Sequence, residues 1–160
     1  MRIGIVSDSH GQVEFTRRAV RMLESCEVEQ VVHCGDIGSL EIIPLLAPWP
    51  THWVFGNVDA DRDAMRKAIE RQGQTCHGDF GSLELAGAKI AFLHGDDMVR
   101  LRREAASGAW DMICYGHTHI ARQHREGRTL LLNPGALYRA AQHTLALVEL
   151  PSCEATHVPL

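Results

Sequence analysis

The sequence predicts an α/β protein in which two mixed β-sheets pack face to face with helices outside. Short apolar runs alternate with amphipathic or charged segments through residues 3–71, which is typical of parallel strands connected by helices. After Gly73 the pattern changes to paired runs joined by turns, which indicates β-hairpins. The length of 160 residues suffices for one complete core, and we expect residues 1–160 to form a single domain.

The first half of the chain predicts three repeats of strand and helix. Continuous apolar residues predict strands buried on both faces at 3–6, 31–34 and 52–55. Helices are expected after each of them, at 13–25, 39–47 and 61–71. Pro48 and Pro50 close the second of these helices.

The second half predicts a β-rich arrangement that is antiparallel in part. A first hairpin pairs 80–85 with 89–93 and leads into a helix at 97–107. A short strand follows at 112–115. The remaining expected elements are a hairpin of 120–124 and 129–132, a loop at 133–136, and a hairpin of 144–150 and 153–158 around Pro151.

Composition excludes several classes of protein. The net charge is -4 and no block of Lys or Arg occurs, so a broad nucleic-acid surface is not expected. The five cysteines are scattered, which argues against a disulfide framework and for a reducing compartment. The apolar run at the N-terminus is too short for a signal peptide, and no run is long enough for a membrane span. We therefore expect a cytoplasmic protein that does not enter the membrane.

Polar side chains follow five of the predicted strands at their carboxyl ends, where parallel sheets bind ligands. The pair His117 and His119 is separated by one residue, so an extended backbone places both imidazoles on one side. Gly116, just before the pair, is expected to free the backbone to turn. The complete candidate set is Asp8, His10, Asp36, Asn57, His94, His117 and His119.

Each of these residues taken singly has a simpler structural explanation. Asp8 could cap a helix, Asp36 and Asn57 could sit in turns, and His94 could be a satisfied polar residue at a strand end. Five independent coincidences at the same edge of the sheets are less plausible than one binding site to which all of these residues contribute. Seven nitrogen and oxygen ligands exceed the four of a tetrahedral zinc. They suit two divalent ions about 3.5–4 Å apart that share a carboxylate, for which Asp36 is the natural candidate.

These residues also carry a family resemblance over residues 3–136. The order and spacing closely resemble those of the calcineurin-like metallophosphoesterases, and the form of the third motif is similar to their small single-domain bacterial and archaeal phosphodiesterases. The motifs are Asp8-x-His10, Gly35-Asp36, Gly56-Asn57-Val58-Asp59, His94, Gly116-His117-Thr118-His119 and Asn133-Pro134-Gly135.

The resemblance implies a four-layer αββα sandwich and a hydrolase that acts on phosphate esters, most simply a phosphodiesterase with a small substrate. It implies one metal held by Asp8, His10, Asp36 and His119, and a second held by Asp36, Asn57, His94 and His117. A hydroxide between the metals would attack phosphorus, and Asn57 could donate a hydrogen bond to a phosphate oxygen. Manganese is the expected metal, and iron, zinc and nickel also suit these ligands.

Two positions depart from the family pattern. Many members carry His at the position of Val58, where it is assigned to protonating the leaving group, which valine cannot do. Asp59 could replace part of that function or cap the following helix. Close relatives often have His at Asp96, which we expect to cap the helix near residue 97. Among other residues, His33 is expected to be buried, His52 and His77 to lie at the surface or a sheet edge, and Arg100 to be solvated.

Two other classes of function remain open. One is a non-catalytic protein-interaction scaffold on the same fold, like the retromer subunit, although the ligand positions here are complete. The other is a sensor that binds a phosphate ligand without turnover. An oligomer is possible through an edge strand such as 153–158.

Overall fold

The apolar runs form two mixed sheets in the computed structural model, which describes residues 1–160. The larger sheet has six strands in the order β11-β10-β1-β2-β3-β4. Its parallel part consists of β1 (Arg2–Val6), β2 (Gln30–His33), β3 (Thr51–Trp53) and β4 (Thr75–Cys76). A final hairpin extends it on the other side, with β10 (Thr144–Glu149) antiparallel to β1 and β11 (Glu154–Pro159) at the edge.

The smaller sheet has five strands in the order β5-β6-β7-β9-β8. Its three inner strands are parallel and its two edge strands are antiparallel to their neighbours. The strands are β5 (Phe80–Leu85), β6 (Ala88–Leu93), β7 (Met112–Cys114), β8 (Ala121–Glu126) and β9 (Thr129–Pro134).

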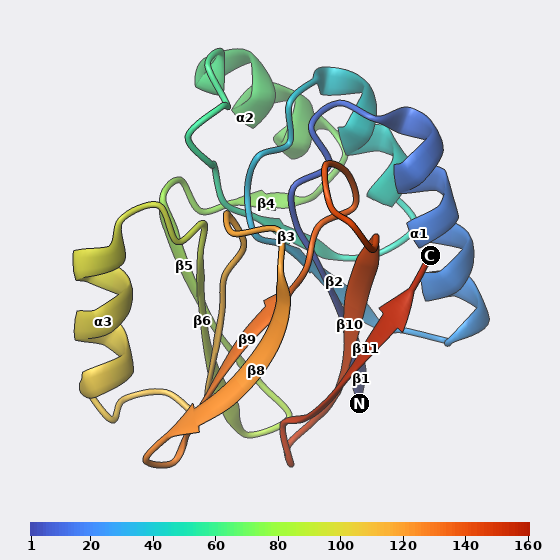
Figure 1. Cartoon of the computed structure of the whole chain (residues 1–160). Helices are drawn as coiled ribbons and strands as arrows, with labels where there is room; N and C mark the ends of the chain where they lie inside the picture. The colour runs from blue at the N-terminus through green and yellow to red at the C-terminus, as the bar shows by residue number, and fades with distance from the viewer.

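The two sheets pack face to face and helices cover their outer faces, so the predicted αββα sandwich is confirmed (Figure 1). Ile5 and Phe92 belong to the apolar cluster between the sheets. The outer face of the larger sheet is covered by α1 (Val13–Ser25), the 3₁₀ helix η1 (Leu40–Leu46) and α2 (Arg62–Arg71). The smaller sheet is covered by α3 (Met98–Ala106), on the opposite side of the molecule in Figure 1.

The predicted elements are confirmed, with two corrections. The short helix expected at 39–47 is the 3₁₀ helix η1, which contains Pro44. The segment 133–136 was expected to be a loop, but Asn133 and Pro134 end β9. The two-residue strand β4 was not expected, since so short a segment carries no alternation to detect. None of the helices combines the length and apolarity needed to span a bilayer.

Candidate metal centre

The seven predicted residues lie in loops that leave the carboxyl ends of five strands. In the larger sheet, Asp8 and His10 follow β1, Asp36 follows β2 and Asn57 follows β3. In the smaller sheet, His94 follows β6, while His117 and His119 follow β7. The face-to-face packing of the sheets brings these two sets of loops into contact, so that one site draws side chains from both sheets.

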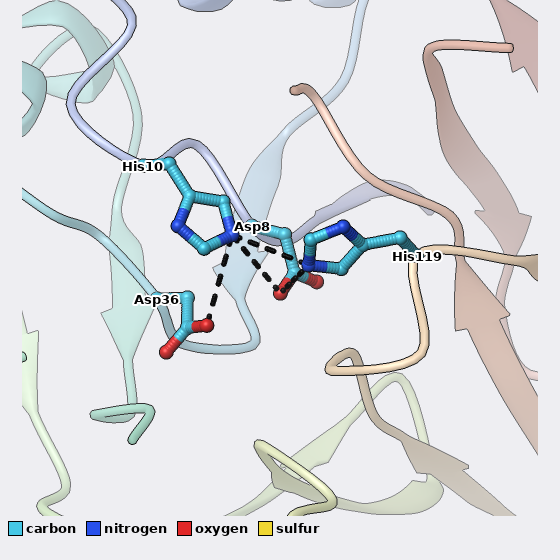
Figure 2. A group of neighbouring side chains, drawn as sticks. All are labelled: Asp8, His10, Asp36 and His119. Carbon is cyan, nitrogen blue, oxygen red and sulfur yellow. Dashed lines mark hydrogen bonds and ion pairs between the residues drawn. The ribbon is translucent and has the colours of Figure 1, made fainter. Parts of the chain in front are cut away.

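One end of the site consists of Asp8, His10, Asp36 and His119, each of which offers an atom within 4.8 Å of the others (Figure 2). The His119 Nε2 atom lies 3.1 Å from Asp8 Oδ1 and 3.2 Å from His10 Nε2. The His10 Nε2 atom in turn lies 3.7 Å from Asp36 Oδ2. Four donor atoms from three loops therefore surround one small volume, as metal ligands do.

The other end of the site begins at the opposite oxygen of the same aspartate. Asp36 Oδ1 lies 3.3 Å from His94 Nε2. Asn57 Oδ1 lies 3.0 Å from His94 Nε2 and 3.1 Å from His117 Nδ1. The Asp36 carboxylate thus stands between the two groups, with one oxygen facing each. All seven predicted residues are brought together.

The tautomers of two histidines direct lone pairs into the site. His94 Nδ1 donates to the Cys34 carbonyl at 2.9 Å, and His119 Nδ1 donates to the Arg139 carbonyl at 3.0 Å. Each Nδ1 atom therefore carries a proton. In a neutral imidazole Nε2 then presents a lone pair to the site, and in a protonated imidazole Nε2 donates to the carboxylate, as His94 does to Asp36. Asp8 Oδ1 is buried without a hydrogen-bond partner. Lone pairs that face one another across so small a space fit a bound cation, and the donor set suits a divalent metal.

Burial and hydrogen bonding change the pKa values at the site in opposite directions. Burial raises the pKa of Asp8 and lowers the pKa of His10. Burial also acts to raise the pKa of Asp36, but hydrogen bonds from His94 and from the Val58 N–H outweigh it and leave this pKa lowered. The same contact with Asp36 outweighs burial at His94, whose pKa is raised. The charged carboxylate of Asp36 is therefore the electrostatic centre of the site.

The backbone at the site is strained. Five of the seven residues have positive φ angles, a backbone conformation that residues other than glycine rarely adopt. The angles are 56° at Asp8, 45° at His10, 54° at Asp36, 68° at His117 and 59° at His119. Such conformations cost about 1–3 kcal/mol each and gather at functional sites, where surrounding structure holds them.

Two glycines allow the loops to approach one another closely. A Cβ atom at Gly116 would lie 1.9 Å from Ser7 Oγ and 2.6 Å from Asp8 Oδ2, and one at Gly56 would lie 2.1 Å from Asp36 Oδ1. Gly116 is not among the residues with positive φ. The expectation that it frees the backbone to turn is thus wrong; it is needed because the loop after β7 lies directly on the end of β1.

Asp59 has a role that the sequence did not reveal. Its buried carboxylate accepts the Gly38 N–H at 2.9 Å and the Gly56 N–H at 2.8 Å. It therefore ties together the loops that carry Asp36 and Asn57. It does not cap α2, whose N-terminus is capped by Asp61. The only available signal was a carboxylate before a helix, and that signal equally predicts a cap.

Other single-residue expectations had mixed outcomes. Asp97, not Asp96, caps α3 by accepting the Arg100 N–H. His33 is fully buried and hydrogen-bonded to Ser9, as expected. His52 and His77 are only partly exposed: they contact each other at 3.1 Å, and their rings pack against Phe92, whose side chain lies in the cluster between the sheets.

Comparison with known proteins identifies the family. The model of the calcineurin-like phosphoesterase superfamily domain matches residues 1–152, and this chain belongs to that superfamily. Phosphodiesterase MJ0936 of Methanocaldococcus jannaschii is 31% identical over 138 residues, which cover 84% of this chain and 83% of that protein. These similarities support the hydrolysis of phosphate esters as the activity.

Solved structures agree with this assignment. A structure described as a novel archaeal phosphodiesterase matches with a TM-score of 0.93 and 28% identity, over 100% of both chains. Vps29 from Entamoeba histolytica matches with a TM-score of 0.70 and 18% identity, over 100% of this chain and 99% of that one. At that identity the likeness to Vps29 shows a shared fold alone.

Proposed function

We propose that this chain is a phosphodiesterase that depends on two divalent metal ions. The observation that carries the proposal is the position of Asp36, whose two carboxylate oxygens face two different groups of ligand atoms, at His10 and at His94. A carboxylate in that position is what a pair of ions sharing one ligand requires. The family and the named phosphodiesterase relative support the chemistry.

The seven residues divide into two ligand sets that share Asp36. Asp8, His10, Asp36 and His119 would hold one ion, and Asp36, Asn57, His94 and His117 would hold the other. Manganese suits this mixture of imidazole, carboxylate and amide ligands, as do iron, zinc and nickel. Such ions would lower the pKa of a bound water molecule and offset the negative charge of the phosphate group.

Hydrolysis consumes one water molecule per diester. A bond forms between water oxygen and phosphorus, one ester P–O bond breaks, and the products are a phosphate monoester and an alcohol. Asn57 directs its Oδ1 atom towards both histidines of its set, so its Nδ2 group is left to donate to a phosphate oxygen. Val58 offers no proton to the departing alcohol, which therefore takes its proton from water.

The proposal is tested by replacing the shared carboxylate. We expect Asp36→Asn to lower the metal content of the purified protein and to reduce hydrolysis of bis(4-nitrophenyl) phosphate with added manganese by more than about 100-fold. Elemental analysis and nitrophenolate release measure the two effects. Asp63→Asn is the matched control, because Asp63 is exposed in the first turn of α2 and makes no hydrogen bond or ion pair with any of the seven site residues.

The wild-type protein should contain about two metal ions per chain and lose its activity to a chelator. Unchanged metal content and activity in Asp36→Asn would contradict the binuclear assignment. A protein that binds metal and hydrolyses no ester would instead have to be a scaffold or a sensor.

A further inference from the structure

Two cavities adjoin the candidate metal centre, and their linings differ in charge. One, of about 160 Å³, includes His94 in its wall. The other, of about 270 Å³, includes His119. Both are smaller than the roughly 300–1,000 Å³ of pockets that enclose a whole drug-sized ligand. Each is therefore suited to one substituent of a substrate.

The two cavities share no lining residue, and each includes one histidine of the candidate metal centre. His119 contacts Asp8 and His10, His10 contacts one oxygen of Asp36, and the other oxygen of Asp36 contacts His94. The two histidines that line the cavities are therefore the ends of this series of contacts. A phosphorus atom held between these two histidines would have one cavity available to each of the two ester arms of a diester.

The cavity beside His94 offers an unused hydrogen-bond donor. Its two guanidinium groups belong to Arg62 and Arg100. Each of the three nitrogens of Arg62 donates one hydrogen bond, to Asp79 at 2.7 Å and to two backbone carbonyls. Arg100 stacks over the Phe80 ring, with Cζ 4.3 Å from the ring centroid. Its Nε is buried without a hydrogen-bond partner, and its two Nη groups also have no partner in the protein, so they are the donors available to the cavity. The expected solvated helix face therefore includes the exposed Arg102 and Arg103, while Arg100 is half-buried.

The same cavity also offers acceptors. Asp96 and Asp97 contribute exposed carboxylates to its wall, and with Asp79 they outnumber the two guanidinium groups. This excess of negative charge disfavours a second anionic group. A hydroxyl group fits, because it can accept from Arg100 and donate to a carboxylate at the same time.

The cavity beside His119 is lined without formal charge. Its other walls come from the start of β8 and the residue before it, and from the start of β10 and the segment before it. This lining suits an uncharged arm that makes few hydrogen bonds. The residues are Ile120, Ala121, Ala141, Gln142 and Thr144.

We propose that the substrate is an asymmetric phosphodiester, with a hydroxylated, uncharged alkyl arm in the cavity beside His94 and an uncharged, less polar arm in the cavity beside His119. Arg100 is the residue that selects the hydroxylated arm. The proposal rests on the phosphodiesterase function proposed above, and it names the class of substrate for that site.

The test compares two esters with the same leaving group, 4-nitrophenyl 2,3-dihydroxypropyl phosphate and 4-nitrophenyl propyl phosphate, with the manganese-loaded protein. We expect kcat/KM for the dihydroxypropyl ester to exceed that for the propyl ester by about tenfold, which is the gain that one hydrogen bond to a charged group provides.

Arg100→Met keeps a flexible stem over Phe80 and should bring this ratio close to one. Arg102→Met, an exposed position on the same helix, should keep the ratio of the wild type. Circular dichroism confirms that both variants fold.

The outcomes separate this inference from the function on which it rests. If the wild type hydrolyses neither ester, the proposed function fails and the inference falls with it. If it hydrolyses both with equal kcat/KM, or if Arg100→Met keeps the preference, the substrate class is wrong while the function stands. A 4-nitrophenyl ester whose second arm carries a carboxylate is the third probe. A preference for that anionic arm over the dihydroxypropyl arm would also overturn the proposal.

Discussion

At the scale of single residues, Val58 is the position where this site departs most clearly from the family pattern. The residue is 42% exposed, and its N–H donates to Asp36 Oδ1 at 3.1 Å. A histidine there would stand beside the proposed phosphate site with room to reach a departing oxygen. It would supply the general acid that valine cannot.

We therefore expect Val58→His to speed hydrolysis of esters with alkyl leaving groups by about 10- to 100-fold, and of 4-nitrophenyl esters far less. Alkoxides need protonation as they leave, whereas nitrophenolate does not. Steady-state kinetics on a matched pair of esters measures the two effects, with Val58→Leu as the control for side-chain size. An equal gain on both esters would remove this explanation of Val58.

The seven candidate ligands could be predicted because each follows an apolar strand at its carboxyl end, a local signal that parallel topology converts into proximity. The expectation that Asp36 is shared between two groups came from the number of ligands, because seven suit two ions with one common carboxylate. The role of Asp59 could not be predicted. Its two hydrogen-bond partners are the backbone N–H groups of Gly38 and Gly56, which belong to separate loops. The residues next to Asp59 in the sequence do not indicate which backbone groups its carboxylate contacts.

At the scale of elements, the loop after β7 is the part of the site with the least room for change. Gly116 lies against Ser7 and Asp8 at the end of β1, and the Asn133 side chain donates to the Gly116 carbonyl at 2.8 Å. Any side chain at residue 116 must therefore displace the end of β1 or move the two histidines that follow.

Gly116→Ala should lower the free energy of unfolding by about 1–3 kcal/mol and weaken metal binding as well. Gly127→Ala is a suitable control, because Gly127 has a φ of 58° but no atom near its absent Cβ. That variant should cost about 1–2 kcal/mol in stability from backbone strain alone and leave metal affinity unchanged. Urea unfolding and metal titration distinguish the two, and an unaltered metal affinity in Gly116→Ala would contradict the close-approach argument.

The elements differed in how predictable they were. Long periodic or continuously apolar segments such as α1 and β1 carry their own signal, and their expected bounds lie within one residue of those found. Residues 39–47 contain apolar residues and Pro44, a pattern that does not separate a 3₁₀ helix from an α-helix. The pairing of β10 with β1 joins residues more than 140 positions apart, so no local pattern could specify it.

At the scale of the whole molecule, His33 links the site loops to the acid stability of the fold. It is fully buried, accepts the Gly35 N–H at Nδ1 and contacts Ser9 Oγ at 2.9 Å. Burial lowers the pKa of His33 to about 3. In the unfolded chain this pKa returns to about 6.5, so the unfolded state binds a proton first as the pH falls.

The free energy of unfolding should therefore decrease as the pH falls from about 6.5 towards 3, with a contribution from His33 of up to about 1.4 kcal/mol per pH unit. Between pH 7 and pH 5, we expect His33→Gln to lose about 2 kcal/mol less stability than the wild type. Urea unfolding of the chelator-treated proteins at both pH values measures the difference. Equal losses would show that His33 does not remain neutral in the fold.

The strained backbone of the site has a consequence for how this protein can change over generations. Five residues with positive φ, at about 1 kcal/mol each, together amount to roughly 5 kcal/mol, which is comparable to the whole stability of a small protein. A descendant without the metal-dependent function proposed above could relieve this strain by exchanging Asp8, His10, Asp36, His117 or His119 for glycine. In this fold, the substitutions that relieve backbone strain at the site are therefore the same ones that remove its candidate ligands.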